Sequence, residues 1–131
     1  MEKRIINPTI WSEQYGFVQG VDVAGDQRTL YCSGQVPVDA EGNVLHAGDM
    51  SKQMDAALDN ADKLLKLAGY EWTEVVRLNY YTTDVPQFIE AAHTLGERLG
   101  PLGCVSTSTL LGVAALFHPD VMIEIEITAE K

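Results

Sequence analysis

The stretch that decides how this chain folds is Val121-Met122-Ile123-Glu124-Ile125-Glu126-Ile127-Thr128-Ala129. Its odd positions are all apolar and its even positions are mostly polar, which is the pattern of a strand with one buried face. Five successive apolar residues on one side need a packed core, and this requirement fixes the register of the strand. The other side then carries Glu124 and Glu126, about 7 Å apart at ~3.3 Å per residue. These carboxylates belong either to a solvated sheet face or to a site.

The length and composition favour one globular domain over residues 1–131. A chain of 131 residues can close a single core, and its 46% hydrophobic content is typical of folded proteins. Its apolar runs are shorter than the roughly 20 residues of a membrane helix. Residues 1–8 do not resemble a signal peptide. We therefore expect a cytoplasmic protein without a membrane partner.

The charge balance disfavours nucleic acid as a partner. The chain has 9 Lys and Arg residues against 19 Asp and Glu residues, a formal net charge of −10, and its basic residues are scattered. Nucleic-acid binding usually needs a basic surface, because neutralised phosphates supply most of the affinity. The two cysteines, Cys32 and Cys104, lack metal-ligand spacing and are interpreted as structural thiols. The sequence predicts no metal site.

Periodicity and turn residues predict the order β-β-α-β-α-β-β. The expected strands are 17–23, 29–35, 75–82, 105–116 and 121–129, with a hairpin turn at 25–27 between the first two. The first expected helix starts at Asp49 and stops at Gly69, and the second starts at Asp84 and stops at Gly100. This order is typical of an α+β fold whose two helices cover one face of a mixed sheet. The other face needs cover, which predicts subunit association with ligand sites at the boundaries.

The chain resembles the RidA/YjgF family of small proteins over nearly its whole length. The resemblance rests on the order of five motifs, none of them specific alone: Tyr15-Gly16-Phe17-Val18-Gln19-Gly20, Ser33-Gly34-Gln35-Val36-Pro37, Gln53 with Asn60, Leu67-Ala68-Gly69, and residues 123–129. It implies a chorismate-mutase-like fold assembled as a homotrimer, with a small-molecule ligand bound in clefts between subunits. It also implies hydrolysis of reactive imines and enamines, such as 2-aminoacrylate, to ketoacids and ammonia without a metal or cofactor.

The resemblance also assigns residues. The family's cleft glutamate corresponds to Glu124, to which we assign the catalytic handling of water. The motif that contains Ser33 and Gly34 contributes substrate-binding positions. Ser33 is interpreted as a hydrogen-bonding group, because no Ser-His-Asp set accompanies it. Glu126 is interpreted as structural.

Three cleft positions depart from the family pattern. Phe17 stands where the family has a tyrosine, Ala92 where it has an asparagine, and Ser108 where it has the arginine that binds the substrate carboxylate. No arginine occurs between residues 100 and 131. A charge-assisted pair is worth about 1.5–3 kcal/mol, so its loss weakens 2-imino acid binding by roughly tenfold or more. The sequence therefore predicts weak or absent action on 2-aminoacrylate.

We include Ser108 and Thr109 among the substrate-binding residues because hydroxyls at 106–109 can act as neutral donors, with Phe17 as an apolar wall. A less anionic or larger ligand would suit such a cleft. His93 is either a partly exposed helix residue or a general acid. Two functional hypotheses remain, a cofactor-free imine or enamine hydrolase with altered substrate preference and a non-catalytic trimer that binds a small metabolite.

Overall fold

Four strands form the main sheet, and the final strand lies inside it. The structure is a computed structural model that describes residues 1–131. Its elements are β1 (Glu2–Ile6), a 3-10 helix (Trp11–Tyr15), β2 (Gly20–Ala24), β3 (Thr29–Tyr31), α1 (Met50–Ala68), a 3-10 helix (Trp72–Glu74), β4 (Val75–Thr82), α2 (Val85–Ala91), α3 (His93–Leu99), β5 (Thr107–Gly112) and β6 (Ile123–Glu130). The strand order of the main sheet is β3-β6-β4-β5, and the sheet is mixed, because β4 pairs parallel with β5 and antiparallel with β6.

The final strand has the predicted alternation. Val121, Ile123, Ile125 and Ile127 are fully buried, whereas Glu124 and Glu126 lie on the opposite, partly exposed face. Cross-strand partners share a face of the sheet, and Leu78 and Tyr80 of β4 sit opposite Ile127 and Ile125. One face of β6 and β4 therefore builds the core.

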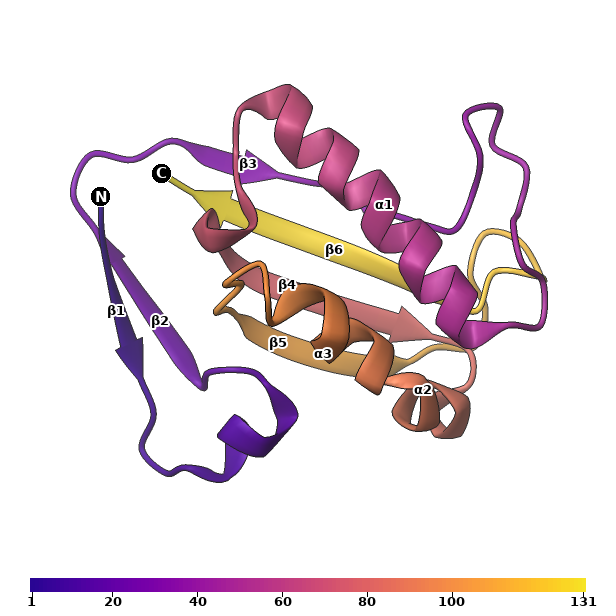
Figure 1. The fold of residues 1–131 in the computed structure, drawn as a ribbon, viewed down its shortest axis with the longest axis horizontal. Helices are drawn as coiled ribbons and strands as arrows, with labels where there is room; N and C mark the ends of the chain where they lie inside the picture. Colours follow the sequence, from indigo (N-terminus) through magenta and orange to yellow (C-terminus); the bar gives the residue numbers. More distant parts are fainter.

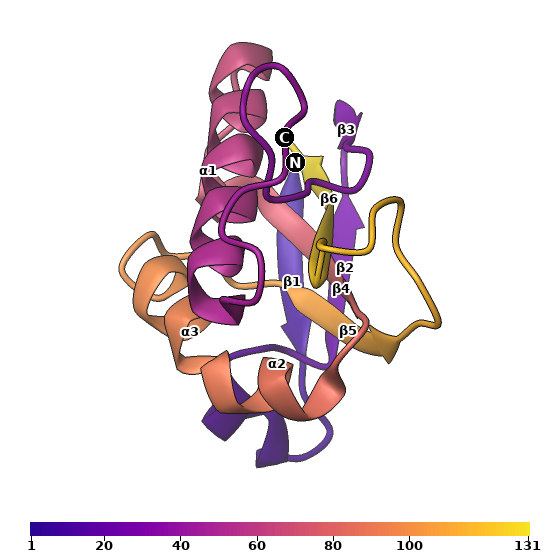
Figure 2. The same ribbon diagram turned by 90° about the vertical axis from the view of Figure 1, so that its right-hand side faces the viewer.

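The helices cover this core face, as predicted. Figures 1 and 2 show α1 and α3 on the same side of the sheet, and α1 packs against both β6 and α3. The Asp49 side chain accepts a hydrogen bond from the Lys52 amide, 3.0 Å away, and Gly69 ends α1 with a φ of 80°. Such an N-cap contributes about 1 kcal/mol, and the positive φ suits glycine. No helix combines the length and the apolar character needed to cross a membrane.

The predicted hairpin between residues 17–23 and 29–35 is wrong. Strand β2 pairs with the N-terminal strand β1, which the sequence analysis did not predict, and β3 pairs with β6. Both extended segments exist, but their partners are set by long-range contacts that local turn residues do not encode. Strand β3 is also shorter than expected. It ends at Tyr31, and Gln35 rejoins β6 only through a bridge to Ile125.

Two other boundaries differ from the prediction. The second helix is interrupted at Ala92, so α2 and α3 are separate, although Asp84 and Gly100 delimit the pair as expected. Strand β5 covers 107–112 rather than 105–116, and the chain then runs as a loop until β6. An apolar run that leaves the sheet partway has no periodic signal for its end, and this explains the longer prediction.

The β1–β2 hairpin lies beside the main sheet, toward the edge that β5 forms (Figure 1). The ammonium of Lys3 donates to the backbone carbonyls of Thr73, Val75 and Val105, at 3.5, 3.3 and 2.8 Å. The Val18 amide donates to the Ser106 carbonyl at 3.1 Å. These contacts bring residues 11–17 to the side of β5 that faces α3.

Candidate functional site

The face of the sheet opposite the helices carries a row of polar side chains. Glu126 of β6 sits opposite Asn79 of β4, which sits opposite Thr109 of β5. Glu124 sits opposite Tyr81 in the next row that faces the same way. Because side chains alternate along each strand, all five residues share this face. We call it the open face.

Glu124 lies against the backbone of Gly34. A Cβ atom built on Gly34 would overlap the Glu124 side chain at its carboxylate and at Cγ. The segment around Gly34 also bonds to β6, because the amide of Gln35 donates to the Ile125 carbonyl at 2.7 Å. Glycine at position 34 therefore leaves the space in which the carboxylate rests.

Glu126 is tied into a hydrogen-bond network. Its Oε1 accepts from the Asn79 amide nitrogen and from the Tyr81 hydroxyl, both at 3.0 Å. Arg77 donates from Nε to the Asn79 amide oxygen at 3.2 Å. Glu126 was expected to be structural, and this network holds its side chain in place on the same face as Glu124.

The electrostatics of the open face favour the protonated form of the Glu124 carboxyl. Loss of hydration raises the pKa of the Glu124 carboxyl, and the nearby charge of Glu126 raises it further. The pKa of the Tyr81 hydroxyl is also raised, first by its hydrogen bond to Glu126. Tyr81 thus stays protonated and keeps donating to Glu126. A carboxyl with a raised pKa holds its proton more readily than an ordinary glutamate, which suits it to accept and return protons.

A large cavity lies on the other side of the sheet, between α3, β5 and the segment 11–17. Its volume is about 880 Å³, and 12 of its 20 lining residues are hydrophobic. Tyr80, Ser106 and Ser108 bring hydroxyl groups to it, and Cys104 brings a thiol. Burial raises the pKa of Cys104, so this thiol stays neutral. We call it the helix-side cavity.

The candidate substrate-binding residues divide between these two places. Phe17, Ala92 and Ser108 line the helix-side cavity. Gly34 and Thr109 lie with Glu124 on the open-face side, and Ser33 is exposed in the segment next to Gly34. Ser108 and Thr109 are adjacent in sequence but face opposite ways, since Ser108 pairs with the core residue Leu78 and Thr109 pairs with Asn79. No single copy of the chain brings all the candidates together.

Two residues at the cavity were not assigned a role by sequence reasoning. The Tyr80 side chain is only 8% exposed, and no hydrogen bond joins its hydroxyl to another group of the chain. Trp11 packs edge-on against Phe17, with ring centroids 5.5 Å apart. No sequence motif marks Tyr80 or Trp11 as functional, because an aromatic residue in a strand or loop is usually interpreted as a packing residue. His93 is exposed at the rim of the cavity, with Nδ1 3.2 Å from the Glu90 carbonyl oxygen.

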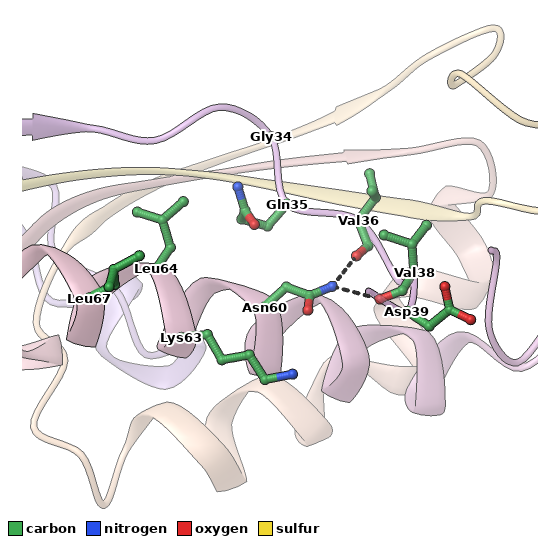
Figure 3. Close-up of a pocket in the computed structure, with 9 residues that line it drawn as sticks. All are labelled: Gly34, Gln35, Val36, Val38, Asp39, Asn60, Lys63, Leu64 and Leu67. Atoms are coloured by element: carbon green, nitrogen blue, oxygen red, sulfur yellow. Dashed lines mark hydrogen bonds between the residues drawn. The ribbon is translucent and has the colours of Figure 1, made fainter. Parts of the chain in front are cut away.

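A shallower groove of about 350 Å³ lies between α1 and the segment that follows Gly34 (Figure 3). Figure 3 shows the amide of Asn60 pointing at that segment, and its Nδ2 donates to the carbonyls of Val36 and Val38 at 2.9 and 3.0 Å. Gln53 acts similarly. It donates to the Leu45 and Asp120 carbonyls and accepts from the Met122 amide. These two side chains position the loops next to Gly34 and the start of β6.

No three histidine, cysteine, aspartate or glutamate side chains gather closely enough to hold a metal ion.

Comparison with known proteins places the chain in a family. The family model described as endoribonuclease L-PSP, which covers the RidA/YjgF proteins, matches residues 12–131. This chain belongs to the RidA/YjgF family. A RutC family protein of Pyrococcus horikoshii is 30% identical over 103 residues, which cover 78% of this chain and 79% of that protein.

Two further RidA/YjgF relatives are informative. The human 2-iminobutanoate/2-iminopropanoate deaminase is 34% identical over 61 residues, covering 47% of this chain and 44% of that protein. The crystal structure of YyfB, a Rid-family protein of unknown function from Yersinia pestis, has a TM-score of 0.85 at 32% identity and covers 98% of both chains. The family and the α+β fold expected from the sequence are therefore confirmed, and the family's members include imine deaminases.

Proposed function

We propose that this RidA/YjgF protein is a cofactor-free hydrolase of imines or enamines, that it works in clefts between copies of the chain, and that its substrate preference differs from that of the deaminases it resembles. The observation that carries the proposal is the placement of Glu124. Its carboxyl has a raised pKa, rests over Gly34 and faces out of the sheet. A group of this kind accepts a proton from water that attacks an imine carbon and returns a proton to the leaving nitrogen.

The division of the candidate residues supports a site between copies. Glu124 and Gly34 meet on the open face, with the exposed Ser33 next to Gly34 in the chain, and the helix-side cavity is lined by Phe17, Ala92 and Ser108. Both sets match cleft positions of the family, so a complete cleft needs the open face of one copy beside the cavity of another. In this arrangement, the trimer expected from the resemblance provides the carboxylate from one copy and the walls of the cavity from its neighbour.

A second function is favoured by one specific observation. Neither Lys nor Arg lines the helix-side cavity, so the cation that binds a substrate carboxylate in related proteins has no counterpart there. If catalysis depends on that cation, the chain is a ligand-binding protein of the same fold. Measured turnover separates the two functions.

The test is imine hydrolysis. An amino-acid oxidase generates imino acids from a set of small and aromatic amino acids, and an amine oxidase generates carboxylate-free imines from primary amines. The remaining imine is trapped by semicarbazide. We expect the protein to accelerate imine loss for at least one substrate. If stoichiometric protein accelerates the loss of no imine, the hydrolase proposal is wrong and the ligand-binding function remains.

The variant Glu124→Gln tests whether the Glu124 carboxylate is catalytic. It keeps the size of the side chain and removes the charge, so we expect activity to fall by ~10²-fold or more, within the range that general acid–base catalysis contributes. The matched control is Glu130→Gln, on the same strand and the same face but at its end, where Glu130 accepts from Thr29. Equal activity in both variants would remove the catalytic assignment of Glu124.

A further inference from the structure

We propose that the helix-side cavity takes imines that have an apolar, ring-sized body and no carboxylate. This inference rests on the proposed hydrolysis and adds the substrate class to it. It concerns the cavity alone and does not depend on which residue activates water.

The charges around the cavity oppose an anionic ligand. Glu13 is the one carboxylate among the lining residues, and it lies exposed at the rim. His93 is the one basic side chain among the lining residues, and it too is exposed. A carboxylate in the interior would lose its hydration without gaining a partner, which is costly. The formal net charge of −10 adds long-range repulsion of anions.

The size and walls of the cavity suit a ring. A volume of about 880 Å³ lies within the range of sites for drug-sized molecules. Trp11 and Phe17 stand edge-to-face at one end, and Tyr80 and Phe88 are tilted against each other at 5.5 Å on the sheet side. Aromatic walls at such angles bind flat apolar groups well. A substrate as small as an imine of alanine would leave most of this space empty.

The Tyr80 hydroxyl is the polar anchor. The side chain is 92% buried by area, its hydroxyl has no hydrogen-bond partner in the chain, and it lines the cavity. A hydroxyl that lines a largely apolar cavity without a partner in the chain is available to pair with a ligand. Loss of hydration raises the pKa of Tyr80, so the group remains a donor. An imine nitrogen, or the carbonyl oxygen of the product, is the acceptor that matches it.

The hydrolysis needs no reactant other than the imine and water. Water adds to the C=N carbon, the C–N bond breaks, and the products are an aldehyde or ketone and ammonia. No oxidation or reduction occurs. Because an amino acid yields an imine that keeps its carboxylate, a carboxylate-free imine comes from a different class of reaction, the oxidation of a primary amine.

The test compares phenylacetone with phenylpyruvate by calorimetric titration of the intact protein. The two molecules share a ring and a ketone, and differ by a methyl group in place of a carboxylate. We expect phenylacetone to bind at least ~10-fold more tightly, since burial of an unpaired charge is costly. Equal or tighter binding of phenylpyruvate would overturn the inference.

Three variants test where the ligand binds. Ser108→Arg adds a cation to the cavity wall, and we expect it to reverse the preference toward phenylpyruvate. Leu67→Arg adds the same charge on α1, where Leu67 is 92% exposed and does not line the cavity, and should leave the preference unchanged. Tyr80→Phe should weaken the binding of phenylacetone by ~3- to 10-fold, the range of one hydrogen bond. The binding of propylbenzene, which has no carbonyl group, should not change. An unchanged preference in Ser108→Arg, with circular dichroism like that of wild type, would place binding elsewhere and overturn the inference.

Different experimental outcomes contradict the proposed hydrolysis and the proposed ligand class. Hydrolysis of imino acids together with tight phenylpyruvate binding would overturn the ligand class and leave the hydrolase standing. Binding of phenylacetone without hydrolysis of any imine would support the ligand class and overturn the hydrolase.

Discussion

The Glu124 carboxylate occupies the space that a side chain at position 34 would fill. Gly34 follows β3 and Glu124 lies near the start of β6, so two segments 90 residues apart in sequence meet at this contact. The contact gives a steric reason for glycine in the Ser33-Gly34-Gln35 motif. It also holds the carboxylate close to the sheet, where loss of hydration raises its pKa.

Gly34→Ala should therefore displace Glu124. We expect imine hydrolysis to fall at least ~10-fold while the fold persists, because small displacements of a positioned catalytic group are costly. Gly20→Ala is the control, since a Cβ there would make ordinary contacts at 3.5 Å. The measurements are initial rates and circular dichroism. Full activity in Gly34→Ala would mean that the position of Glu124 is not critical.

Glu126 should tune the pH dependence of activity. Its charge contributes to the raised pKa of Glu124, so the neutral variant Glu126→Gln should lower that pKa. If Glu124 works as an ionised base, the acid limb of the rate profile then moves to lower pH. We expect this shift in kcat/KM measured between pH 5 and 8. An acid limb at the same pH in both proteins would rule out this electrostatic coupling.

Ionised Glu124 should lower stability at neutral pH. Its pKa in the folded state is above the ordinary value of 4.5, so the folded protein binds the proton more tightly than the unfolded chain does. Stability from this group is therefore lost as pH rises from about 4.5 through the raised pKa. Glu124→Gln should melt at a higher temperature than wild type at pH 7 and show little difference at pH 4. Thermal unfolding at both pH values measures this, and the opposite order at pH 7 would contradict it.

Asn60 should matter for stability rather than for binding. Its amide donates to two carbonyls, and Asn60→Ala leaves both without that partner, a loss of about 1–3 kcal/mol. Lys63→Ala, one turn further along α1 beside the same groove, should change stability by less than about 0.5 kcal/mol. Urea unfolding compares the two. Similar values for both variants would mean that the Asn60 bonds contribute nothing measurable.

Several features of the fold were readable from local sequence. The final strand, the helix at 50–68 with its cap at Asp49, and the strand at 75–82 have strong periodicity or capping residues, and all three exist. The final strand was predicted at 121–129 and runs over Ile123–Glu130. The partner of the segment 20–24 was not readable. Turn residues between two strands say that the chain reverses there, but they do not say which edge each strand joins.

The candidate site shows the same limit. Motif matching identified positions such as Phe17, Ser33 and Ser108, but the matching carries no information on which face each one occupies. Thr109 and Ser108 differ by one residue, and the pleat sends them to opposite sides of the sheet. Tyr80 was missed because a tyrosine in a strand has no chemical signature until the fold shows that it lines a cavity.

The sequence by itself determined the family, the α+β class and the register of the final strand, because alternating burial along one strand is a local property. Only the tertiary structure decided that Glu124 rests on Gly34, that the N-terminal hairpin leaves the main sheet, and that the binding candidates divide between two faces. These depend on contacts between segments far apart in the chain, whose geometry is set by packing of the whole core rather than by any one stretch of residues.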